Sequence, residues 1–399
     1  MRSLIAASGF EKEVSSYGSG KLPENELREL AIDNPNSFIR VVKPQFIDPS
    51  ILPGSIEFLE ASKSNLMSLI HGNVLQSLPN GIFLYSQFQP QTQQLLLGWV
   101  VGITAESYFT GHIKKHENTI EGKENRLVDH LEALDAIAEP VLLANEFSDE
   151  LTEIMHATYR NEPLISVTDI YGFVHELRGE FEESNYNQVL QLIDQIGYLY
   201  IADGHHRFAA ASKYLQKHNW SLSKGVMSLV MNQVDLSIKS FYRLIEYTKQ
   251  IDFESELRRF GIDYKMGELN SFEDCKLKTG EIIAFTTQGD FKIKISNKLK
   301  ERHNAVDELE VSMLEKFILG PIFNLHDSKT DDRISFLRGD TPLHEVKSKI
   351  INGEVNFIFM LPPNTFSQVM HVADQQLTMP PKSTWIEPKL MTGFLIQQF

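Results

Sequence analysis

The stretch 198–217 limits the fold of this chain more than any other. Residues 198–202 form an apolar run of strand type, the polar loop 203–207 follows, and the alanine-rich residues 208–217 have helical character. A strand, a tight turn and a helix in direct succession are typical of an α/β sheet covered by helices. The next apolar run, at 226–232, predicts another strand of the same sheet.

Apolar periodicity and turn-forming residues predict the remaining elements. Helices are expected at 23–33, 208–217 and 306–319, strands at 37–42, 141–144 and 355–361, and hairpins at 82–88 with 95–104, within 164–177, and at 281–287 with 291–295. A further helix carries Leu127, Leu131 and Leu134 on one face and Lys123, Arg126 and His130 on another stripe. We expect a mixed α/β (α+β) protein with an N-terminal α/β extension at 1–80, a core at 81–250 and a C-terminal α/β domain at 251–399.

Charge and cysteine content disfavour several classes of function. The 399 residues have a formal net charge of -15, which makes nucleic acid an unfavourable partner. The one cysteine, Cys275, excludes an intrachain disulfide and a cysteine-based zinc site, and it fits a reducing compartment. The apolar run 95–105 is too short to cross a membrane, and the N-terminus has no secretory pattern. We therefore expect a cytoplasmic protein without membrane contact.

The loop Asp203–Gly204–His205–His206–Arg207 has the composition of an anion-binding turn. A helix N-terminus exposes free N–H groups, the glycine allows close approach, and the arginine can hold two phosphate oxygens. A phosphate cradle is one interpretation. The alternative is that Asp203 merely caps the helix and Gly204 relieves the turn. Adjacent histidines do not share one face of a helix, so His205 and His206 are not expected to bind one zinc ion.

Two other segments carry reactive side chains. The mixed-charge run 114–126 contains His116 and Glu117, and a carboxylate beside cations can accept a hydroxyl proton during phosphoryl transfer. The alternative is a solvated face, which most charge runs of this kind form. The tail 379–385 joins two prolines to Lys382, Ser383 and Thr384, which suit either an anion-binding segment or an inert turn. Walker A, HRD, HExxH and GxSxG patterns are absent.

Taken together, the DGHHR loop, the His116–Glu117 pair and the Pro-Pro-Lys-Ser-Thr tail resemble one family. It is the large bacterial and archaeal family related to the ParB/sulfiredoxin fold, whose relatives include the free L-serine kinases. The resemblance implies a ParB/sulfiredoxin-like nucleotide-binding core, with nucleotide phosphates on Asp203, Gly204, His205, His206 and Arg207. It also implies a catalytic base at Glu117.

The resemblance further implies where the phosphate acceptor would bind. The substrate-side positions are His116, Arg243, Lys382, Ser383 and Thr384, and Arg243 is the only residue kept where many members carry Pro-Thr-His-Arg. Mg²⁺ with ATP or ADP is the expected cofactor, although no metal ligand is identified. The implied function is a nucleotide-dependent phosphotransferase acting on a small hydroxyl compound such as free L-serine.

Two alternatives to a kinase remain open at this point. A ParB-like nucleotide-binding switch or scaffold would need the phosphate cradle but not Glu117. A degenerate member of the family would keep the fold and act through protein contacts alone. The sequence leaves open whether the chain forms a homodimer.

Overall fold

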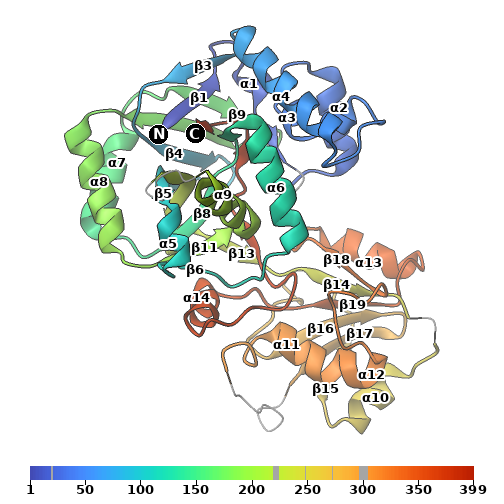
Figure 1. The fold of residues 1–399 in the computed structure, drawn as a ribbon. Helices are drawn as coiled ribbons and strands as arrows, with labels where there is room; N and C mark the ends of the chain where they lie inside the picture. The colour runs from blue at the N-terminus through green and yellow to red at the C-terminus, as the bar shows by residue number, and fades with distance from the viewer. Residues whose placement is uncertain (19–20, 219–223, 248, 272, 296–303) are drawn as a thin grey trace. The chain divides into compact units, whose positions relative to one another are not determined.

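The computed structural model describes residues 1–399 except 19–20, 219–223, 248, 272 and 296–303. The chain forms two compact units. Unit 1 contains residues 1–114, 118–236 and 388–399, and unit 2 contains residues 115–117 and 237–387. Both units combine sheets with helices, which confirms the predicted mixed α/β class (Figure 1).

Unit 1 is built on an eight-stranded mixed sheet. In order, its strands are β6 (Ile113–Lys114), β11 (Leu199–Asp203), β8 (Val141–Asn145), β12 (Gly225–Asn232), β5 (Gln94–Thr104), β4 (Ile82–Gln89), β10 (Val174–Glu180) and β9 (Ile165–Thr168). β12 runs parallel to β8, and β11 runs antiparallel to β8. The apolar runs that predicted strands at 82–88, 95–104, 198–202 and 226–232 all lie in this sheet, so those predictions are confirmed.

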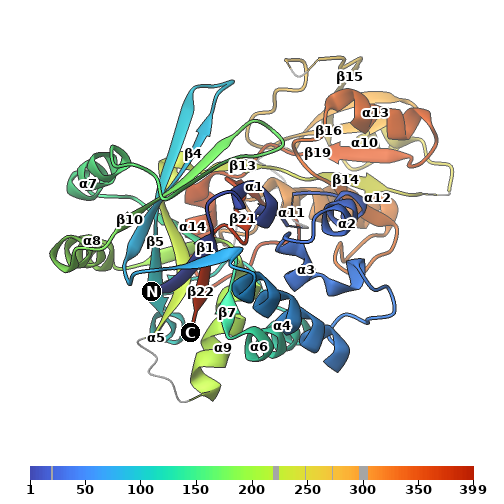
Figure 2. The ribbon, with the colours of Figure 1, turned by 90° about the horizontal axis from the view of Figure 1, so that it is seen from above.

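Two smaller sheets complete unit 1. The first has the order β3 (Leu75–Leu78), β1 (Arg2–Ala6), β22 (Ile396–Gln398) and β7 (Ala136–Ile137), and in the second β2 (Ser16–Tyr17) pairs with β21 (Met391–Thr392). Because β1 and β22 are antiparallel neighbours, the two ends of the chain lie side by side (Figures 1 and 2). The segment 388–399 thus packs in unit 1, although the sequence placed it in the C-terminal domain 251–399.

Helices cover these sheets. They are α1 (Glu11–Val14), α2 (Glu24–Asp33), α3 (Ile39–Val42), η1 (Pro44–Phe46), α4 (Ile56–His71), α5 (Ala105–Phe109), α6 (Glu121–Leu134), α7 (Asp149–Tyr159), α8 (Glu183–Gln195), α9 (His205–Lys217) and η2 (Gln233–Asp235). α6 packs against both α4 and α9 (Figure 1). α9 begins at His205, so the last three residues of the expected loop form its first turn.

The strand predicted at 37–42 is wrong, because this stretch folds as α3. Its β-branched residues suggested a strand, but local and tertiary contacts override that preference. Asn34 starts a turn by accepting from the N–H of Asn36, and Nε of Arg40 donates to the carbonyl of Ala31 over 2.7 Å. The short helix then buries Ile39 and Val41 against the rest of unit 1.

A buried polar network ties β2 to the β9–β10 hairpin. The Tyr17 hydroxyl donates to Asp169 over 2.6 Å, and His175 Nε2 lies 3.0 Å from the same carboxylate oxygen. On the other side of the ring, the Tyr85 hydroxyl lies 2.7 Å from His175 Nδ1. Buried polar groups are stable when they are satisfied in this way, so the network fixes β2 and, through the β2–β21 pairing, the segment that follows Lys389.

Unit 2 contains a six-stranded sheet with helices on both faces. The strand order is β15 (Asp263–Gly267), β17 (Gly289–Lys294), β16 (Glu281–Thr286), β19 (Phe357–Met360), β14 (Tyr242–Ile245) and β18 (Ile334–Leu337), and β13 (Ser237–Lys239) pairs separately with β20 (Trp385–Glu387). The helices are α10 (Phe253–Arg259), α11 (Glu310–Leu314), the π-helical turn η3 (Glu315–Leu319), α12 (Gly320–Phe323), α13 (Leu343–Ile351) and α14 (Phe366–Asp374). Leu343 and Val346 of α13 pack on one face of the six-stranded sheet, and the rings of Phe253 and Phe323 pack on its other face.

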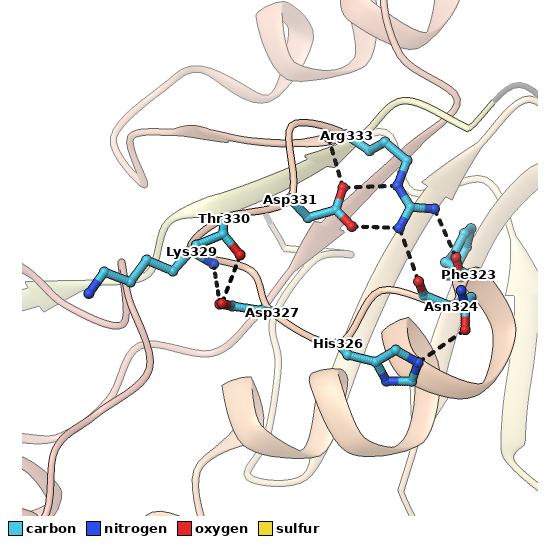
Figure 3. Close-up of polar contacts among 8 residues, drawn as sticks. All are labelled: Phe323, Asn324, His326, Asp327, Lys329, Thr330, Asp331 and Arg333. Carbon is cyan, nitrogen blue, oxygen red and sulfur yellow. Dashed lines mark hydrogen bonds and ion pairs between the residues drawn. The ribbon is translucent and has the colours of Figure 1, made fainter.

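The loop between α12 and β18 is closed by one arginine (Figure 3). Arg333 forms two hydrogen bonds to the Asp331 carboxylate. Its remaining N–H groups donate to the carbonyls of Phe323 and Asn324 over 3.1 and 3.0 Å. These carbonyls stand at the C-terminus of α12, where the helix itself provides no donors. Arg333 therefore caps α12 and orders the loop at once.

The predicted domain ranges 1–80, 81–250 and 251–399 stay predictions, since compact packing units and evolutionary domains are different divisions of a chain. The packing units change at Leu236 and Ser237, close to the expected boundary near 250. Within the described parts of both units, no helix combines the length and the apolar character required to cross a bilayer.

Candidate functional site: a cationic cavity at the start of α9

The turn that joins β11 to α9 depends on glycine. Gly204 occupies the N-cap position of α9 with a φ of +97°, in the left-handed region. A Cβ atom at this position would lie 2.9 Å from Nη2 of Arg207, so a side chain here would collide with the arginine as well as strain the backbone. Among the described residues, no side chain forms a capping hydrogen bond to the helix N-terminus, and the interpretation of Asp203 as a simple helix cap is therefore not supported.

A chain of four alternating charges runs through this turn. Lys389 Nζ lies 3.0 Å from Asp203 Oδ1, and Arg207 Nη2 lies 3.0 Å from Asp203 Oδ2. Arg207 Nη1 continues the chain to Glu139 Oε1 at 2.6 Å. Partial burial by itself raises the pKa of Asp203, but Lys389 and Arg207 outweigh it and lower the pKa to about 2. Asp203 is therefore ionised at neutral pH and holds both cations in place.

The neighbouring guanidinium stays charged for the same reason. Burial alone lowers the pKa of Arg207, but Glu139 and Asp203 raise it above the ordinary arginine value. The sequence of the loop predicts that Arg207 binds phosphate directly. In this structure its two terminal nitrogens already contact the two carboxylates, so an incoming anion would have to compete with them or add to them.

A cavity of about 770 Å³ opens beside this charged chain, and all the residues that line it belong to unit 1. Its cationic lining consists of Lys21, Lys43, Lys123, Arg126, Arg207 and Lys389, with His206, against the carboxylates of Asp203 and Glu139. Its apolar lining includes Leu27, Ile39, Val42 and Phe58 from α2, α3 and α4, and Leu127, Leu131 and Leu134 from α6. The excess of positive charge favours an anionic ligand, and the apolar walls favour a ligand that also has a flat or hydrophobic group.

Three of these cations have no carboxylate partner in the part of the chain that the structure describes. They are Lys43, which follows α3, and Lys123 and Arg126, which lie in the first turns of α6. Cations without partners beside a cavity are available to an anionic ligand. The segment 114–126, predicted as a possible solvated face, thus contributes two side chains to the cavity.

His206 is oriented by the start of α6. The backbone N–H of Ile120 donates to Nδ1 of His206 over 3.4 Å, so a neutral ring carries its proton on Nε2. The adjacent Glu124 is buried and ion-paired with Lys213. Burial raises the pKa of Glu124, but hydrogen bonds from Lys213 and Thr119 outweigh it and lower the pKa. His206 therefore lies beside a fixed carboxylate.

The two histidines of the loop, both predicted to contact phosphate, have different environments. His205 is buried, with 5% of its surface exposed, whereas His206 lines the cavity. Successive helical residues point about 100° apart, which explains the difference. Of the five residues predicted to bind phosphate, Asp203, His206 and Arg207 line the cavity, Gly204 shapes the turn, and His205 is part of the protein interior.

The predicted substrate-side residues belong to unit 2, as does Glu117. The carbonyl of His116 accepts from the backbone N–H of Met379 over 2.8 Å, so the His116–Glu117 pair adjoins the tail segment 379–384. The His116 side chain is buried and that of Glu117 is partly buried. The structure thus brings these two motifs together within unit 2, although more than 250 positions separate them.

Arg243 also contacts this tail segment. Its side chain is fully buried, Nη1 donates to the carbonyl of Phe241 over 3.1 Å, and Nη2 donates to the carbonyl of Lys382 over 3.2 Å. Burial lowers the pKa of Arg243 to about 10, and Glu315 opposes this shift. Nε of Arg243 has no hydrogen-bond partner within the described residues. Arg243 therefore fixes the backbone of the tail.

The tail itself folds as a tight turn. The Ser383 hydroxyl donates to the carbonyl of Pro380 over 2.6 Å, and the side-chain amide of Asn364 donates to the carbonyl of Ser383 over 2.8 Å. Lys382 is exposed, has a φ of +55°, and places Nζ 5.2 Å from the centre of the Phe241 ring. Thr384 is partly buried. The serine hydroxyl is thus used within the turn, whereas the lysine reaches the surface.

Sequence reasoning missed several residues of the cavity. Glu139 was not among the predicted site residues, and Lys389 carried no signal, because its ion pair with Asp203 depends on the return of the chain to unit 1. The apolar wall from α3 was hidden by the wrong strand prediction. No group of three or more His, Cys, Asp or Glu residues in the described chain is arranged to hold a metal ion.

Comparisons with known proteins identify a family and several similar structures. The family model described as "Protein of unknown function (DUF1015)" matches residues 14–312. No curated protein matches the chain. A structure of free serine kinase in complex with AMP is 14% identical, with 73% of this chain and 88% of that chain covered and a TM-score of 0.38. SbnI from Staphylococcus aureus, with a C-terminal truncation, is 12% identical, with coverages of 72% and 82% and a TM-score of 0.38. A conserved hypothetical protein from Pyrococcus furiosus is 15% identical, with coverages of 72% and 90% and a TM-score of 0.34.

Proposed function

Because the chain belongs to the DUF1015 family, whose description assigns no activity, we propose a function from the chemistry of its own residues. The protein is a nucleotide-dependent phosphotransferase that acts on a small hydroxyl compound, and free L-serine is the acceptor to test first. The cavity of unit 1 binds the nucleotide. Residues of unit 2 supply the base and the contacts to the acceptor.

One observation carries the nucleotide part of this proposal. The cavity combines six lysine and arginine side chains with an apolar wall, and it lies at the glycine-containing start of α9. The lysine and arginine side chains suit the phosphates of a nucleotide, and the apolar wall suits its nucleobase. A protein with a net charge of -15 that gathers cations at one cavity has a strong electrostatic reason to bind an anion there.

The roles of the individual residues follow from their chemistry. In this proposal His206, Arg207 and Lys389 contact the phosphates, and Asp203 and Gly204 hold the turn that presents them. His205, which the sequence assigned to the phosphates, supports the turn from the interior. Phosphoryl transfer depends mainly on positioning and on charge neutralisation, and these residues supply both.

Glu117 is the proposed base for the acceptor hydroxyl. A carboxylate can accept the hydroxyl proton as the phosphoryl group is transferred. His116, Arg243, Lys382, Ser383 and Thr384 are the proposed acceptor-side residues. In the geometry described above, Lys382 is the exposed cation among them, so it is the most suitable partner for a carboxylate of the acceptor, while Arg243 and Ser383 support the turn.

Mg²⁺ with ATP or ADP is the proposed cofactor. The described residues offer no ligand cluster of their own for the metal, which fits an ion bound chiefly by phosphate oxygens and water. When bound, Mg²⁺ neutralises phosphate charge. The cations of the cavity perform the same task from the protein side.

The proposal is tested by binding and turnover in the same samples. Isothermal titration measures the affinity for AMP, ADP and ATP with Mg²⁺, and product analysis measures phosphoserine formed from L-serine. For Glu117→Gln we expect unchanged nucleotide affinity and at least a hundredfold loss of turnover, because a general base typically contributes about 10²–10⁴-fold. Glu121→Gln, an exposed carboxylate at the start of α6, is the matched control. Equal turnover in Glu117→Gln and the wild type would reject the catalytic role.

A nucleotide-binding switch without kinase activity is the second candidate. One observation favours it: every residue lining the cavity belongs to unit 1, whereas Glu117 belongs to unit 2. Such a protein would bind ADP or ATP, would form no phosphoserine, and would not respond to Glu117→Gln. The same titration and product analysis therefore separate the two candidates.

A further inference from the structure

The cavity of unit 1 has a charged end and an apolar end, and α6 runs between them. Lys123 and Arg126 lie near its N-terminus, and Leu131 and Leu134 lie near its C-terminus; all four line the cavity. At about 1.5 Å per residue, Lys123 and Leu134 are roughly 16 Å apart along the helix axis. A nucleotide that places its phosphates at the charged end therefore extends its base toward the apolar end.

His130 is the polar side chain on this apolar stretch of α6. It lines the cavity between Leu127 and Leu134, and its ring centre lies 5.8 Å from that of Phe58. Its Nε2 atom is buried and has no hydrogen-bond partner within the described residues. A buried ring nitrogen without a partner is costly in a protein interior, and a ligand that satisfied it would gain that interaction.

The protonation of the ring defines what it can recognise. Burial lowers the pKa of His130, and a hydrogen bond to the backbone of Val41 opposes this only in part. At neutral pH the ring is therefore neutral, with one nitrogen as donor and the other as acceptor. Because the carbonyl of Val41 takes the donor, the acceptor nitrogen is left for the ligand.

We propose that His130 reads the base of the bound nucleotide and selects adenine and cytosine over guanine and uracil. Adenine and cytosine carry an exocyclic amino group, which can donate to the acceptor nitrogen, at the ring position where guanine and uracil carry a carbonyl oxygen. The carbonyl oxygen of guanine or uracil would face the lone pair of the His130 acceptor nitrogen, and neither of these two buried acceptors would receive a hydrogen bond. Phe58 and the leucines of α6 supply flat, apolar contacts that do not distinguish between bases.

This inference rests on the proposed nucleotide site, and one set of titrations tests both. Dissociation constants are measured for ADP, CDP, GDP and UDP with Mg²⁺. For the wild type we expect ADP and CDP to bind about tenfold or more tightly than GDP and UDP, the range expected when a buried polar group loses its partner. For His130→Leu we expect weaker binding of ADP and CDP, unchanged binding of GDP and UDP, and a preference below about twofold.

Two further variants keep the test decisive. His130→Gln retains a polar side chain in case the leucine variant fails to fold, and its amide can both donate and accept, so we expect the preference to fall as in the leucine variant. Phe58→Leu should weaken all four nucleotides by similar factors. A wild type without a base preference, or a preference that survives both His130 substitutions, would overturn the role of His130 while leaving the nucleotide site intact. Absence of binding for all four nucleotides in a folded protein would instead reject the proposed function itself, and the inference with it.

Discussion

Lys389 donates to the Asp203 carboxylate over 3.0 Å, although 186 positions separate the two residues in the chain. The second oxygen of the same carboxylate accepts from Arg207. One aspartate therefore fixes two cations beside the cavity, and one of them arrives only where the chain has returned to unit 1 after residue 387. The predicted loop 203–207 thus obtains one of the two cations that contact Asp203 from Lys389, far away in the sequence.

Removal of that lysine should weaken nucleotide binding more than it weakens the fold. For Lys389→Ala we expect ADP affinity to fall by about 1.5–3 kcal/mol, the usual contribution of a hydrogen bond to a charged group. Lys389→Arg should retain most of the affinity, because it keeps the charge. Isothermal titration gives the affinities and thermal unfolding reports on the fold. Lys349→Ala is the control, since Lys349 forms an ion pair with Glu354 in unit 2; an equal loss in both alanine variants would contradict a specific role for Lys389.

The depressed pKa of Asp203 predicts a loss of stability in acid. The pKa falls from an ordinary 3.8 to about 2 in the folded protein. A carboxyl group with a lowered folded-state pKa stabilises the fold above its unfolded-state pKa, and this contribution disappears as the pH falls through the folded-state value. We therefore expect the free energy of unfolding of the wild type to drop more steeply between about pH 4 and about pH 2 than that of Asp203→Asn.

Denaturant titrations across this pH range measure the effect. Asp129→Asn serves as the control, because Asp129 is exposed on α6 and makes no hydrogen bond or ion pair to the described residues. Its pH profile should follow that of the wild type. Parallel profiles for the wild type and Asp203→Asn would mean that the ion pairs of Asp203 contribute nothing to folding.

Local sequence signals were sufficient for most strands of the eight-stranded sheet of unit 1, but they did not predict the helices α4, α7 and α8. The run 198–202 is apolar and contains two tyrosines and an isoleucine, which favour a strand, and Gly204 marks the turn. The β11–α9 junction could therefore be predicted from adjacent residues. The run 37–42 is equally apolar but folds as α3, because the turn at Asn34 and the Arg40 contact to Ala31 decide its conformation. Strand propensity over so few residues is easily overridden by such contacts.

The cavity could be predicted only in part, for a different reason. Asp203, His206 and Arg207 are close in sequence, and their donor-rich pattern was visible. Glu139, Lys389 and the apolar wall of α3 come from three other regions, and their meeting depends on tertiary packing. The pattern of one sequence carries no direct information on such pairs. The role of Ser383 stays a prediction, and the bond of its hydroxyl to the carbonyl of Pro380 is a property of the folded turn that the sequence does not show.

The loop in Figure 3 provides a stability test that is independent of any ligand. Arg333→Ala removes the donors to the carbonyls of Phe323 and Asn324 and leaves the Asp331 carboxylate without its cationic partner, with only the backbone N–H of residue 333 as a donor. We expect the free energy of unfolding to fall by about 1–3 kcal/mol, the typical cost of hydrogen bonds to a charged group. Lys329→Ala removes a positive charge from the same loop and should change stability by less than about 0.5 kcal/mol. Chemical denaturation measures the stability of the wild type and of both variants. Equal stability of Arg333→Ala and the wild type would show that Arg333 is dispensable for the loop.

Cys275 should be chemically inert in the folded protein. Its side chain is 1% exposed and packs in the core of unit 2 with Leu244 and Ile283. Burial raises the pKa of the thiol to about 11, so the reactive thiolate is scarce at neutral pH. We expect an aromatic disulfide reagent to label the native protein at least a hundredfold more slowly than the unfolded chain, and Cys275→Ala to keep the nucleotide affinity of the wild type. Fast labelling of the native protein would contradict the burial of this thiol, and loss of turnover in a folded Cys275→Ala variant would implicate the thiol in the reaction.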